Sequence, residues 1–331
     1  MNCASIIGDG AWGTALALVL HRNGRRVRIW SPFPEHVCEA IAIGENRRFL
    51  PGIPLPPELE WTDREDLAMQ NVELVVIAVP SAHVDGVLRR FVGRVPPNAL
   101  YVSVTKGLHP THLWRMTETI ERVWGVGPVV ALSGPSFAVE VAQDWPTAVV
   151  AACRDHDQAR AVQQWFVRPS FRVYTSDDVI GVELGGALKN VIAIAAGVCD
   201  GLGLGANAKA ALVTRGLAEM TRLAVAAGAH PATLSGLSGV GDLMLTCYGH
   251  RSRNRNFGER IGRGECPAKI LANVEYVVEG VTNCDHAARL AEHHGVHMPI
   301  AEAVRDVIHG RISPAEAVAR LLQREPKPER G

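Results

Sequence analysis

Short runs of apolar residues alternate with helical patterns over the first part of the chain. Continuous apolar runs that end at turn-forming residues are typical of strands buried on both faces of a sheet. Strands that alternate with helices predict a doubly wound parallel sheet. The expected strands cover residues 4–7, 27–30, 74–79, 100–104, 129–132, 148–152 and 171–174.

The strand pattern stops near residue 180, and helical periodicity dominates from there on. A chain of 331 residues is long enough for two domains. We therefore expect an α/β domain over residues 1–178 and an all-α domain over residues 179–331. The helices expected in the second domain cover residues 182–197, 208–227, 268–272, 284–294 and 300–308.

The segment 182–201 is apolar on every helical face, which predicts a buried helix. Between Glu183 and Asp200 its one charge is Lys189, and the positions three and four residues before it are Gly186 and Gly185. Small neighbours predict room beside this lysine. A desolvated lysine favours the neutral amine, which can accept a proton. The alternative interpretation is a small-residue helix crossing whose lysine reaches solvent.

The first predicted strand leads directly into GDGAWG at residues 8–13. In the GxGxxG pattern the first glycine permits a tight turn, here Gly8. Gly10 lets the backbone approach a pyrophosphate, and Gly13 allows close packing of helix on strand. Because a strand precedes and a helix follows, we expect a dinucleotide-binding Rossmann domain. The alternative is a glycine-rich turn without a ligand.

The choice between NAD and NADP is left open by the end of the second predicted strand. NAD sites usually place Asp or Glu there, and NADP sites place Arg. Here Trp30 is followed by Ser31, Pro32 and Phe33, with no Arg. Arg47 and Arg48 come later, in a turn-rich segment, and are most simply solvated. They are also the first basic residues to consider for a 2′-phosphate.

Polar residues follow two further predicted strands, at the sheet edge where open α/β sheets bind ligands. Lys106 comes just after residues 100–104, and it is either a ligand contact or a surface lysine. Residues 133–138 read SGPSFA after the next strand, with Ser136 a candidate helix cap.

The second domain contributes a carboxylate and a basic segment. Asp242 lies in the glycine-rich run GVGDL, and we expect it to orient Lys189 and hold its charge state. Residues 251–256 read RSRNRN, which predicts a basic loop in which Arg253, Ser252 and Asn254 grip a phosphate. The alternatives are a solvated loop or a nucleic-acid-binding loop.

Composition narrows the classes of partner. The formal net charge is zero and the pI is about 7.2, so no overall field attracts nucleic acid or an anionic membrane. Seven scattered cysteines without a CxxC pair fit reduced thiols. The N-terminus enters a strand at once, so we expect no signal peptide. The prediction is a soluble cytoplasmic protein without membrane insertion. Its oligomeric state stays open, with a homodimer among the options.

Two other chemistries find little support. His293 and His297 have the i, i+4 spacing of metal ligands, but no glutamate between them completes an HExxH motif. No metal is therefore expected. The chain also has no Gly-x-Ser-x-Gly elbow, which argues against acyl-transfer hydrolysis.

Taken together, a nicotinamide site, a buried lysine and a phosphate-binding segment predict hydride transfer to the carbonyl of a small phosphorylated substrate. Several sequence blocks occur along the chain in the same order as in the bacterial-type NAD(P)-dependent glycerol-3-phosphate dehydrogenases, and the chain resembles that family. The resemblance spans residues 8 to about 300, and its most specific blocks surround Lys189 and residues 252–258. The matching blocks are GDGAWGTALA, FLPG, VTKGL, SGPSFAVEVA, ELGGALKNVIAIAAG, GVGDLMLTC, SRNRNFG and VVEG.

The resemblance implies reversible reduction of dihydroxyacetone phosphate to sn-glycerol 3-phosphate for glycerophospholipid synthesis, with NAD or NADP as cofactor. It implies Lys189 as general acid/base, with Asp242, Asn190 and Thr246 in supporting roles. The implied cofactor contacts are Gly8, Gly10, Ala11, Trp12, Gly13, Phe49, Lys106, Ala138, Arg253, Val277 and Glu279. The implied substrate contacts are Lys106, Gly134, Ser136, Lys189, Asp242, Ser252, Arg253 and Asn254.

Two other functions compete with this hypothesis. A β-hydroxyacid or phosphogluconate-type dehydrogenase also combines a Rossmann domain, a helical domain and a catalytic lysine, but its own substrate motif is not found here. A dinucleotide-binding sensor would keep the fold without turnover. Lys189, Asp242 and Arg253 argue against the sensor, because a sensor needs no proton donor.

Overall fold

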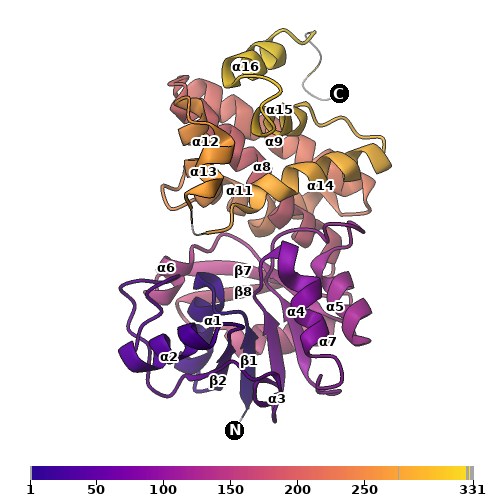
Figure 1. Cartoon of the computed structure of the whole chain (residues 1–331). Helices are drawn as coiled ribbons and strands as arrows, with labels where there is room; N and C mark the ends of the chain where they lie inside the picture. The colour runs from indigo at the N-terminus through magenta and orange to yellow at the C-terminus, as the bar shows by residue number, and fades with distance from the viewer. Residues whose placement is uncertain (1, 275, 326–327, 329–331) are drawn as a thin grey trace. The chain divides into compact units, whose positions relative to one another are not determined.

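The computed structural model describes residues 2–274, 276–325 and 328 (Figure 1). The chain forms two compact units. The sheet unit comprises residues 1–186 and 228–242, and the helical unit comprises residues 187–227 and 243–331. The sequence predicts a single domain boundary after residue 178. The structure instead places residues 228–242 in the sheet unit. The expected domain boundary stays a prediction.

The sheet unit is built on an eight-stranded sheet with the order β3-β2-β1-β4-β5-β6-β7-β8. All expected strands are confirmed to within two residues, and a short edge strand, β3, was not predicted. Its three residues include no continuous apolar run, so periodicity gave no signal. The strands are β1 (Cys3–Ile7), β2 (Arg26–Trp30), β3 (Glu60–Thr62), β4 (Leu74–Ile77), β5 (Leu100–Ser103), β6 (Val130–Ser133), β7 (Thr147–Ala152) and β8 (Phe171–Ser176).

The doubly wound α/β fold is confirmed, with one departure from a fully parallel sheet. Strands β6 and β7 pair antiparallel, whereas the other neighbouring pairs are parallel. The helix between them, α6 (Ala138–Ala142), has five residues and packs on α1. At about 1.5 Å per residue such a helix is too short to return the chain along the length of the sheet.

Alternation along the central strands explains why helices cover both faces of the sheet (Figure 1). On β1, Ala4 and Ile6 join one buried cluster, while Cys3 and Ile7 join the other. Successive side chains of a strand point to opposite faces, so an uninterrupted apolar strand must be covered twice. The helices of this unit are α1 (Ala11–Arg22), α2 (Pro34–Ile43), α3 (Glu65–Ala68), α4 (Val84–Arg90), α5 (Met116–Trp124), α6, α7 (His156–Phe166) and α10 (Pro231–Leu234), with short turns at Ser81–His83 and Leu237–Gly241.

Among its described residues the helical unit contains helices and no strand, as expected. The predicted helices are confirmed, and the structure adds helices that begin near residues 242, 253 and 314. The helix α8 (Val179–Gly201) starts in the sheet unit and continues into this one. The others are α9 (Gly205–Ala226), α11 (Asp242–Tyr248), α12 (Arg253–Gly262), α13 (Pro267–Ala272), α14 (Glu279–His293), α15 (Pro299–Ile308) and α16 (Pro314–Leu322).

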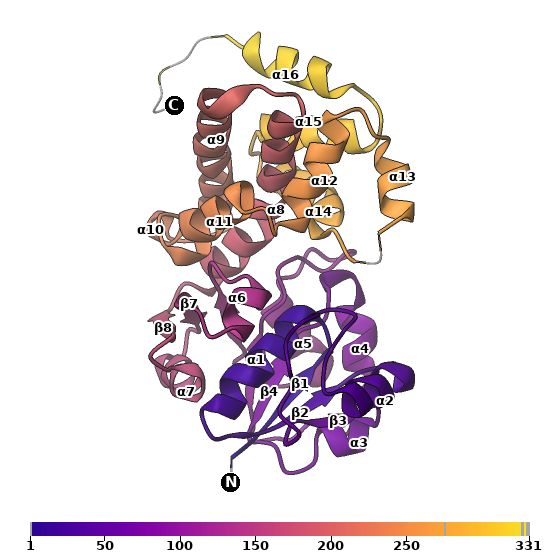
Figure 2. The same ribbon diagram turned by 90° about the vertical axis from the view of Figure 1, so that its left-hand side faces the viewer.

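In the helical unit, α8 and α12 lie side by side at backbone contact (Figure 2). A Cβ atom on Gly197 would lie 1.9 Å from the carbonyl oxygen of Arg255. From the other helix, a Cβ on Gly258 would lie 2.0 Å from the carbonyl oxygen of Ile194. Glycine on both helices is therefore what permits this crossing. The two helices approach each other more closely than helices that carry larger side chains at their contact.

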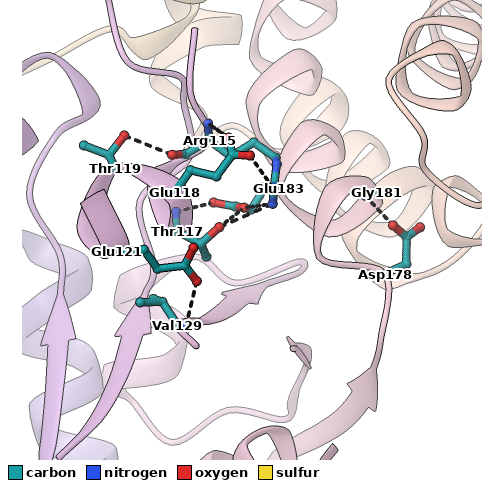
Figure 3. A network of polar contacts seen from close by, with 9 residues as sticks. All are labelled: Arg115, Thr117, Glu118, Thr119, Glu121, Val129, Asp178, Gly181 and Glu183. Atoms are coloured by element: carbon teal, nitrogen blue, oxygen red, sulfur yellow. Dashed lines mark hydrogen bonds and ion pairs between the residues drawn. The ribbon is translucent and has the colours of Figure 1, made fainter. Parts of the chain in front are cut away.

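The first part of α8 is fastened to α5 by a buried carboxylate. Figure 3 shows Glu183 facing Arg115 and Thr117. Arg115 donates to Glu183 at 3.0 Å, and Thr117 donates through its backbone N–H at 2.9 Å and its hydroxyl at 2.6 Å. Burial raises the pKa of Glu183, and Arg115 and the Thr117 donors oppose that rise. The contacts compensate for the burial of this carboxylate and fix the start of α8.

By length and composition alone α8 could cross a membrane, with a mean hydropathy of 1.6 in its most apolar window. However, 94% of that window is buried inside the protein. Burial of this kind identifies a core helix, which is what a helix that is apolar all round becomes in a packed protein.

Candidate active site

The glycine loop between β1 and α1 has the form that a dinucleotide requires. A Cβ on Gly13 would lie 2.4 Å from the carbonyl oxygen of Gly8, and a Cβ on Gly8 would lie 2.8 Å from that of Ala78. Gly10 differs, because a Cβ there would meet nothing within 4 Å. Gly8 and Gly13 thus serve packing inside the protein, and Gly10 borders open space.

The start of α1 can accept a negatively charged group. Gly10 is its N-cap, and no side chain caps the first turn or places a carboxylate there. The backbone N–H groups at the start of a helix attract phosphate. The indole N–H of Trp12 is also buried without a hydrogen-bond partner among the described residues. The loop therefore fits the pyrophosphate of NAD or NADP. The contacts of Ala11 and Trp12 to the cofactor stay predictions.

Phe49 is held beside this loop by an asparagine that sequence reasoning did not identify. Asn46 donates to the carbonyl oxygen of Asp9 at 2.7 Å and to the hydroxyl of Thr14 at 2.9 Å. Its own side-chain oxygen accepts from the backbone N–H of Phe49 at 3.2 Å. Asn46 thus ties the segment after α2 to the dinucleotide loop.

A second polar group of the sheet unit gathers after β5 and β6. The ammonium of Lys106 donates to Asp242 at 2.6 Å and to the carbonyl oxygen of Gly134 at 3.1 Å. The same carbonyl accepts from the hydroxyl of Ser136 at 3.0 Å. Asp242 is 1% exposed, so its charge needs a close cation, and Lys106 supplies one. The structure brings together four of the predicted substrate contacts.

The space beside the two glycines that precede Lys189 on its helix face was expected to be open, and it is filled by protein. A Cβ on Gly185 would lie 2.5 Å from the carbonyl oxygen of Ser238, and one on Gly186 would lie 2.9 Å from the hydroxyl of Ser133. The prediction of free space there was wrong. The pattern of small residues has a packing cause, because these glycines let α8 approach neighbouring chain closely.

Lys189 itself is buried in the helical unit, with 6% of its surface exposed. Its ammonium donates to the hydroxyl of Thr246, on α11, at 2.7 Å. Thr246 is 4% exposed, so the pair is shielded from bulk water. The alternative in which Lys189 escapes to solvent is therefore wrong. A long, flexible side chain is held in one place by a hydroxyl.

Next to Lys189 runs a ladder of amide hydrogen bonds. Asn254, on α12, donates to the side-chain oxygen of Asn190 at 2.9 Å. Its own oxygen accepts from the backbone N–H of Gly280 at 2.9 Å. Asn283 donates to the carbonyl oxygen of Ala187 at 3.1 Å, a contact that sequence reasoning missed. The ladder joins α8, α12 and α14 around the candidate site.

The basic segment at residues 251–256 was expected to be a loop, and that prediction was wrong. Arg253 is the first residue of α12, and the hydroxyl of Ser252 caps the helix by accepting from the backbone N–H of Arg255 at 3.2 Å. The sequence RSRNRN contains a good N-cap, which outweighs its charge as a structural signal. Arg253 is exposed and lies over the ring of Tyr276, whereas Arg255 is buried against Asp200.

The remaining predicted contacts lie at the starts of helices. Ala138 is the first residue of α6, and Glu279 is the first residue of α14. Val277 is 37% exposed and lies two residues before α14. Their contacts to a cofactor stay predictions. Only the family resemblance indicated these three residues, because the sequence pattern around them does not by itself predict a cofactor contact.

The fold and the site define a class before any relative is considered. A glycine-rich turn opens onto a helix N-terminus, a lysine paired with a buried carboxylate follows a parallel strand, and a shielded lysine lies in a helical unit. These are the parts of a nicotinamide-dinucleotide-dependent oxidoreductase.

Two family models match the chain. The model for the NAD-dependent glycerol-3-phosphate dehydrogenase N-terminus matches residues 4–159, and the model for the C-terminus matches residues 178–319. The chain belongs to the NAD-dependent glycerol-3-phosphate dehydrogenase family.

Individual relatives agree with that assignment. The chain is 48% identical to a glycerol-3-phosphate dehydrogenase (NAD(P)+) of Koribacter versatilis and 47% identical to one of Geobacter metallireducens, over 98% of each chain. Among solved structures, glycerol-3-phosphate dehydrogenase from Coxiella burnetii superposes with a TM-score of 0.94 at 40% identity. That match covers 98% of this chain and 99% of the other.

Proposed function

We propose that this protein catalyses the NAD(P)H-dependent reduction of dihydroxyacetone phosphate to sn-glycerol 3-phosphate and the reverse oxidation. The observation that carries the proposal is the buried Lys189, held at 2.7 Å by Thr246 in a chain of this family. The names of the relatives supply the substrate and the cofactor. The nicotinamide, when bound, supplies or accepts the hydride.

Lys189 is the proposed general acid and base. In reduction its ammonium donates a proton to the carbonyl oxygen of the substrate, which becomes the new hydroxyl. In oxidation the neutral amine takes that proton back. The hydroxyl of Thr246 accepts from the ammonium and so fixes its direction. Burial of the pair at 6% and 4% exposure strengthens its electrostatic effect on a developing alkoxide.

The start of α12 is the proposed phosphate site. The helix has ten residues, its N-cap is Ser252, and Arg253 and Asn254 occupy its first two positions. A helix N-terminus and a guanidinium both favour a phosphate monoester. Because Arg255 already pairs with Asp200 at 2.6 Å, the phosphate-binding role falls to Arg253.

In the sheet unit, Lys106 is the proposed ligand contact and Asp242 its positioning partner. The 2.6 Å ion pair and the bond to Gly134 direct the ammonium at the carboxyl end of β5. The further prediction that Asp242 orients Lys189 stays a prediction.

The test is the loss of absorbance at 340 nm when purified protein receives NADH or NADPH and dihydroxyacetone phosphate. We expect turnover with the phosphorylated substrate and at least about 100-fold lower kcat/KM with unphosphorylated dihydroxyacetone, since a charged phosphate contact is lost. Equal rates with both substrates would contradict the phosphate site. Cofactor binding without turnover would support the sensor, and turnover of β-hydroxyacids alone would support the other dehydrogenase class.

The product is the proposed precursor for glycerophospholipid synthesis. A cytoplasmic location and a homodimeric assembly stay predictions. The lack of nucleic-acid or membrane partners also stays a prediction, and the neutral charge balance of the chain supports it.

A further inference from the structure

A polar cluster lies at the carboxyl end of β2, the place where Rossmann domains receive the adenosine ribose. We call Asp9, Ser31, His36, Arg48 and Phe49 the ribose-end cluster. Asp9 belongs to the glycine loop, Ser31 follows β2, and His36 lies on α2. Arg48 and Phe49 belong to the segment that Asn46 fastens to the glycine loop. All of them are in the sheet unit.

Hydrogen bonds join the members in a row. The carboxylate of Asp9 accepts from the hydroxyl of Ser31 at 2.8 Å and lies 3.1 Å from Nδ1 of His36. Nε2 of His36 in turn contacts Nη1 of Arg48. A guanidinium has donors only, so Nε2 must be the acceptor. Nδ1 then carries the proton and donates it to Asp9.

With this assignment the two charged groups of the cluster, the carboxylate of Asp9 and the guanidinium of Arg48, have different kinds of partner. Asp9 is 7% exposed at the residue level, and its Oδ2 already accepts from two donors, so this oxygen is not open to the ribose 2′-hydroxyl of NAD. Arg48 is exposed, and its Nη1 contacts the imidazole that this assignment makes neutral. An arginine held by a neutral acceptor is oriented, yet its positive charge is not cancelled at that contact.

The neighbouring arginine is arranged differently. Arg47 is exposed and lies 3.7 Å from the carboxylate of Glu45, an ordinary surface ion pair. Arg48 instead packs over the ring of Phe49, with 5.5 Å from the guanidinium carbon to the ring centroid. One face of its planar group and one N–H are thereby fixed, and the guanidinium retains further donors.

We propose that Arg48, positioned by His36, binds the 2′-phosphate of NADP(H) and gives this protein a preference for NADP(H) over NAD(H). This inference rests on the proposed function for the presence of a nicotinamide cofactor. In this proposal Arg48, from the segment that follows α2, takes the role of the arginine that is missing after Trp30. Ser31, whose hydroxyl also accepts from the backbone N–H of Phe33 at 3.2 Å, keeps the end of β2 compact beneath it.

The experiment uses calorimetric titration of the whole protein with adenosine 2′,5′-bisphosphate and with 5′-AMP, so that the readout is binding and not turnover. The wild type should bind the bisphosphate at least about tenfold more tightly than 5′-AMP, as expected for one charged hydrogen-bonding partner. Arg48→Ala should remove most of that preference and leave the Kd of 5′-AMP unchanged. Arg47→Ala is the matched control and should keep the preference.

A second variant tests the positioning. His36→Phe keeps an aromatic ring but removes the acceptor for Arg48. The ratio of the Kd of 5′-AMP to that of the bisphosphate should therefore fall to about its square root, for example from about tenfold to about threefold. Equal affinity of the wild type for both probes would overturn the proposal, as would an unchanged preference in Arg48→Ala. An equal loss in Arg47→Ala would also overturn it, by showing a diffuse charge effect.

Failure of this inference is separable from failure of the proposed function. Turnover of dihydroxyacetone phosphate with NADH and NADPH at equal kcat/KM would leave the function intact and reject Arg48 as a selector. Preferential binding of the bisphosphate by a protein without turnover would support Arg48 and reject the function.

Discussion

The sheet unit and the helical unit build their candidate functional groups by different means. In the sheet unit the dinucleotide loop is shaped by backbone, with Gly8 and Gly13 in contact with neighbouring carbonyl groups and Gly10 facing open space. In the helical unit the candidate chemistry depends on buried side chains, each held by another: Lys189 by Thr246, and Asn190 by Asn254.

The difference shows which substitutions each unit can tolerate. A backbone-built loop depends on the absence of side-chain atoms, so its weak points are glycines. A side-chain-built site depends on paired polar groups, so its weak points are donors and acceptors whose loss leaves a partner unsatisfied. Glycines matter in the helical unit as well: Gly197 and Gly258 let α8 and α12 approach at backbone contact, and Gly280 donates its backbone N–H to the hydrogen-bond ladder.

The largest effect is expected at Lys189. Lys189→Met should lower kcat by at least about 100-fold, because the reaction loses its general acid and base. Lys209→Met is the matched control, since Lys209 is also buried and pairs with Asp200 at 2.7 Å. The control should lower Tm and keep kcat within a few-fold. Steady-state kinetics with thermal melts separate the two, and near-normal kcat in Lys189→Met would refute the assigned role.

The next effect tests the helix crossing. Gly197→Ala should reduce the free energy of unfolding by about 1–3 kcal/mol, because its Cβ would lie 1.9 Å from a carbonyl oxygen of α12. Gly86→Ala, in α4, has nothing within 4 Å and should be neutral or stabilising by up to about 1 kcal/mol. Urea denaturation measures both. Similar losses in the two variants would mean that helix packing is not the cause.

A smaller effect should separate packing from ligand approach in the glycine loop. Gly10 has a φ of −63°, which alanine adopts without strain, and its Cβ would project into open space. Gly10→Ala should therefore keep Tm and raise the Kd of NADPH by about tenfold, since the methyl group blocks close approach of the pyrophosphate. Fluorescence titration checks this. Unchanged affinity would show that the cofactor does not approach at Gly10.

The smallest effect concerns a buried carboxylate that holds the start of α15. Glu219, on α9, accepts from the backbone N–H of Ile300 at 3.0 Å at the start of α15. Burial raises its pKa from 4.5 to about 7. The backbone N–H groups of Ile300 and Ala301 and the charge of Arg222 lower this pKa, and the charge of Glu302 raises it. Because the folded state binds this proton more tightly than the unfolded state, stability should fall as pH rises from about 4.5 to 7.

Glu219→Gln keeps an oxygen acceptor and removes the titration. The variant should lack this fall, with a difference from the wild type on the order of 1 kcal/mol across the range. Unfolding free energies measured at several pH values provide the test. Parallel profiles for the two proteins would show that Glu219 does not titrate in that range.

Several features were predictable because their signals are local. Continuous apolar runs located the central strands, GDGAWG located the dinucleotide loop, and an all-round apolar segment located α8. The antiparallel pairing of β6 with β7 and the helix that begins at Arg253 were not predictable in this way. Both depend on how a segment meets distant parts of the chain, and in α12 an N-cap serine outweighed a run of charge.

The sequence by itself determined the α/β and all-α character of the two parts, the dinucleotide loop and the buried helix that carries Lys189, because periodicity and glycine spacing act over a few residues. The tertiary structure alone decided which partner each polar residue meets. It paired Lys106 with Asp242, Lys189 with Thr246, and Arg48 with His36. Buried polar groups must find partners, and those partners are far apart in the sequence, so packing selects them.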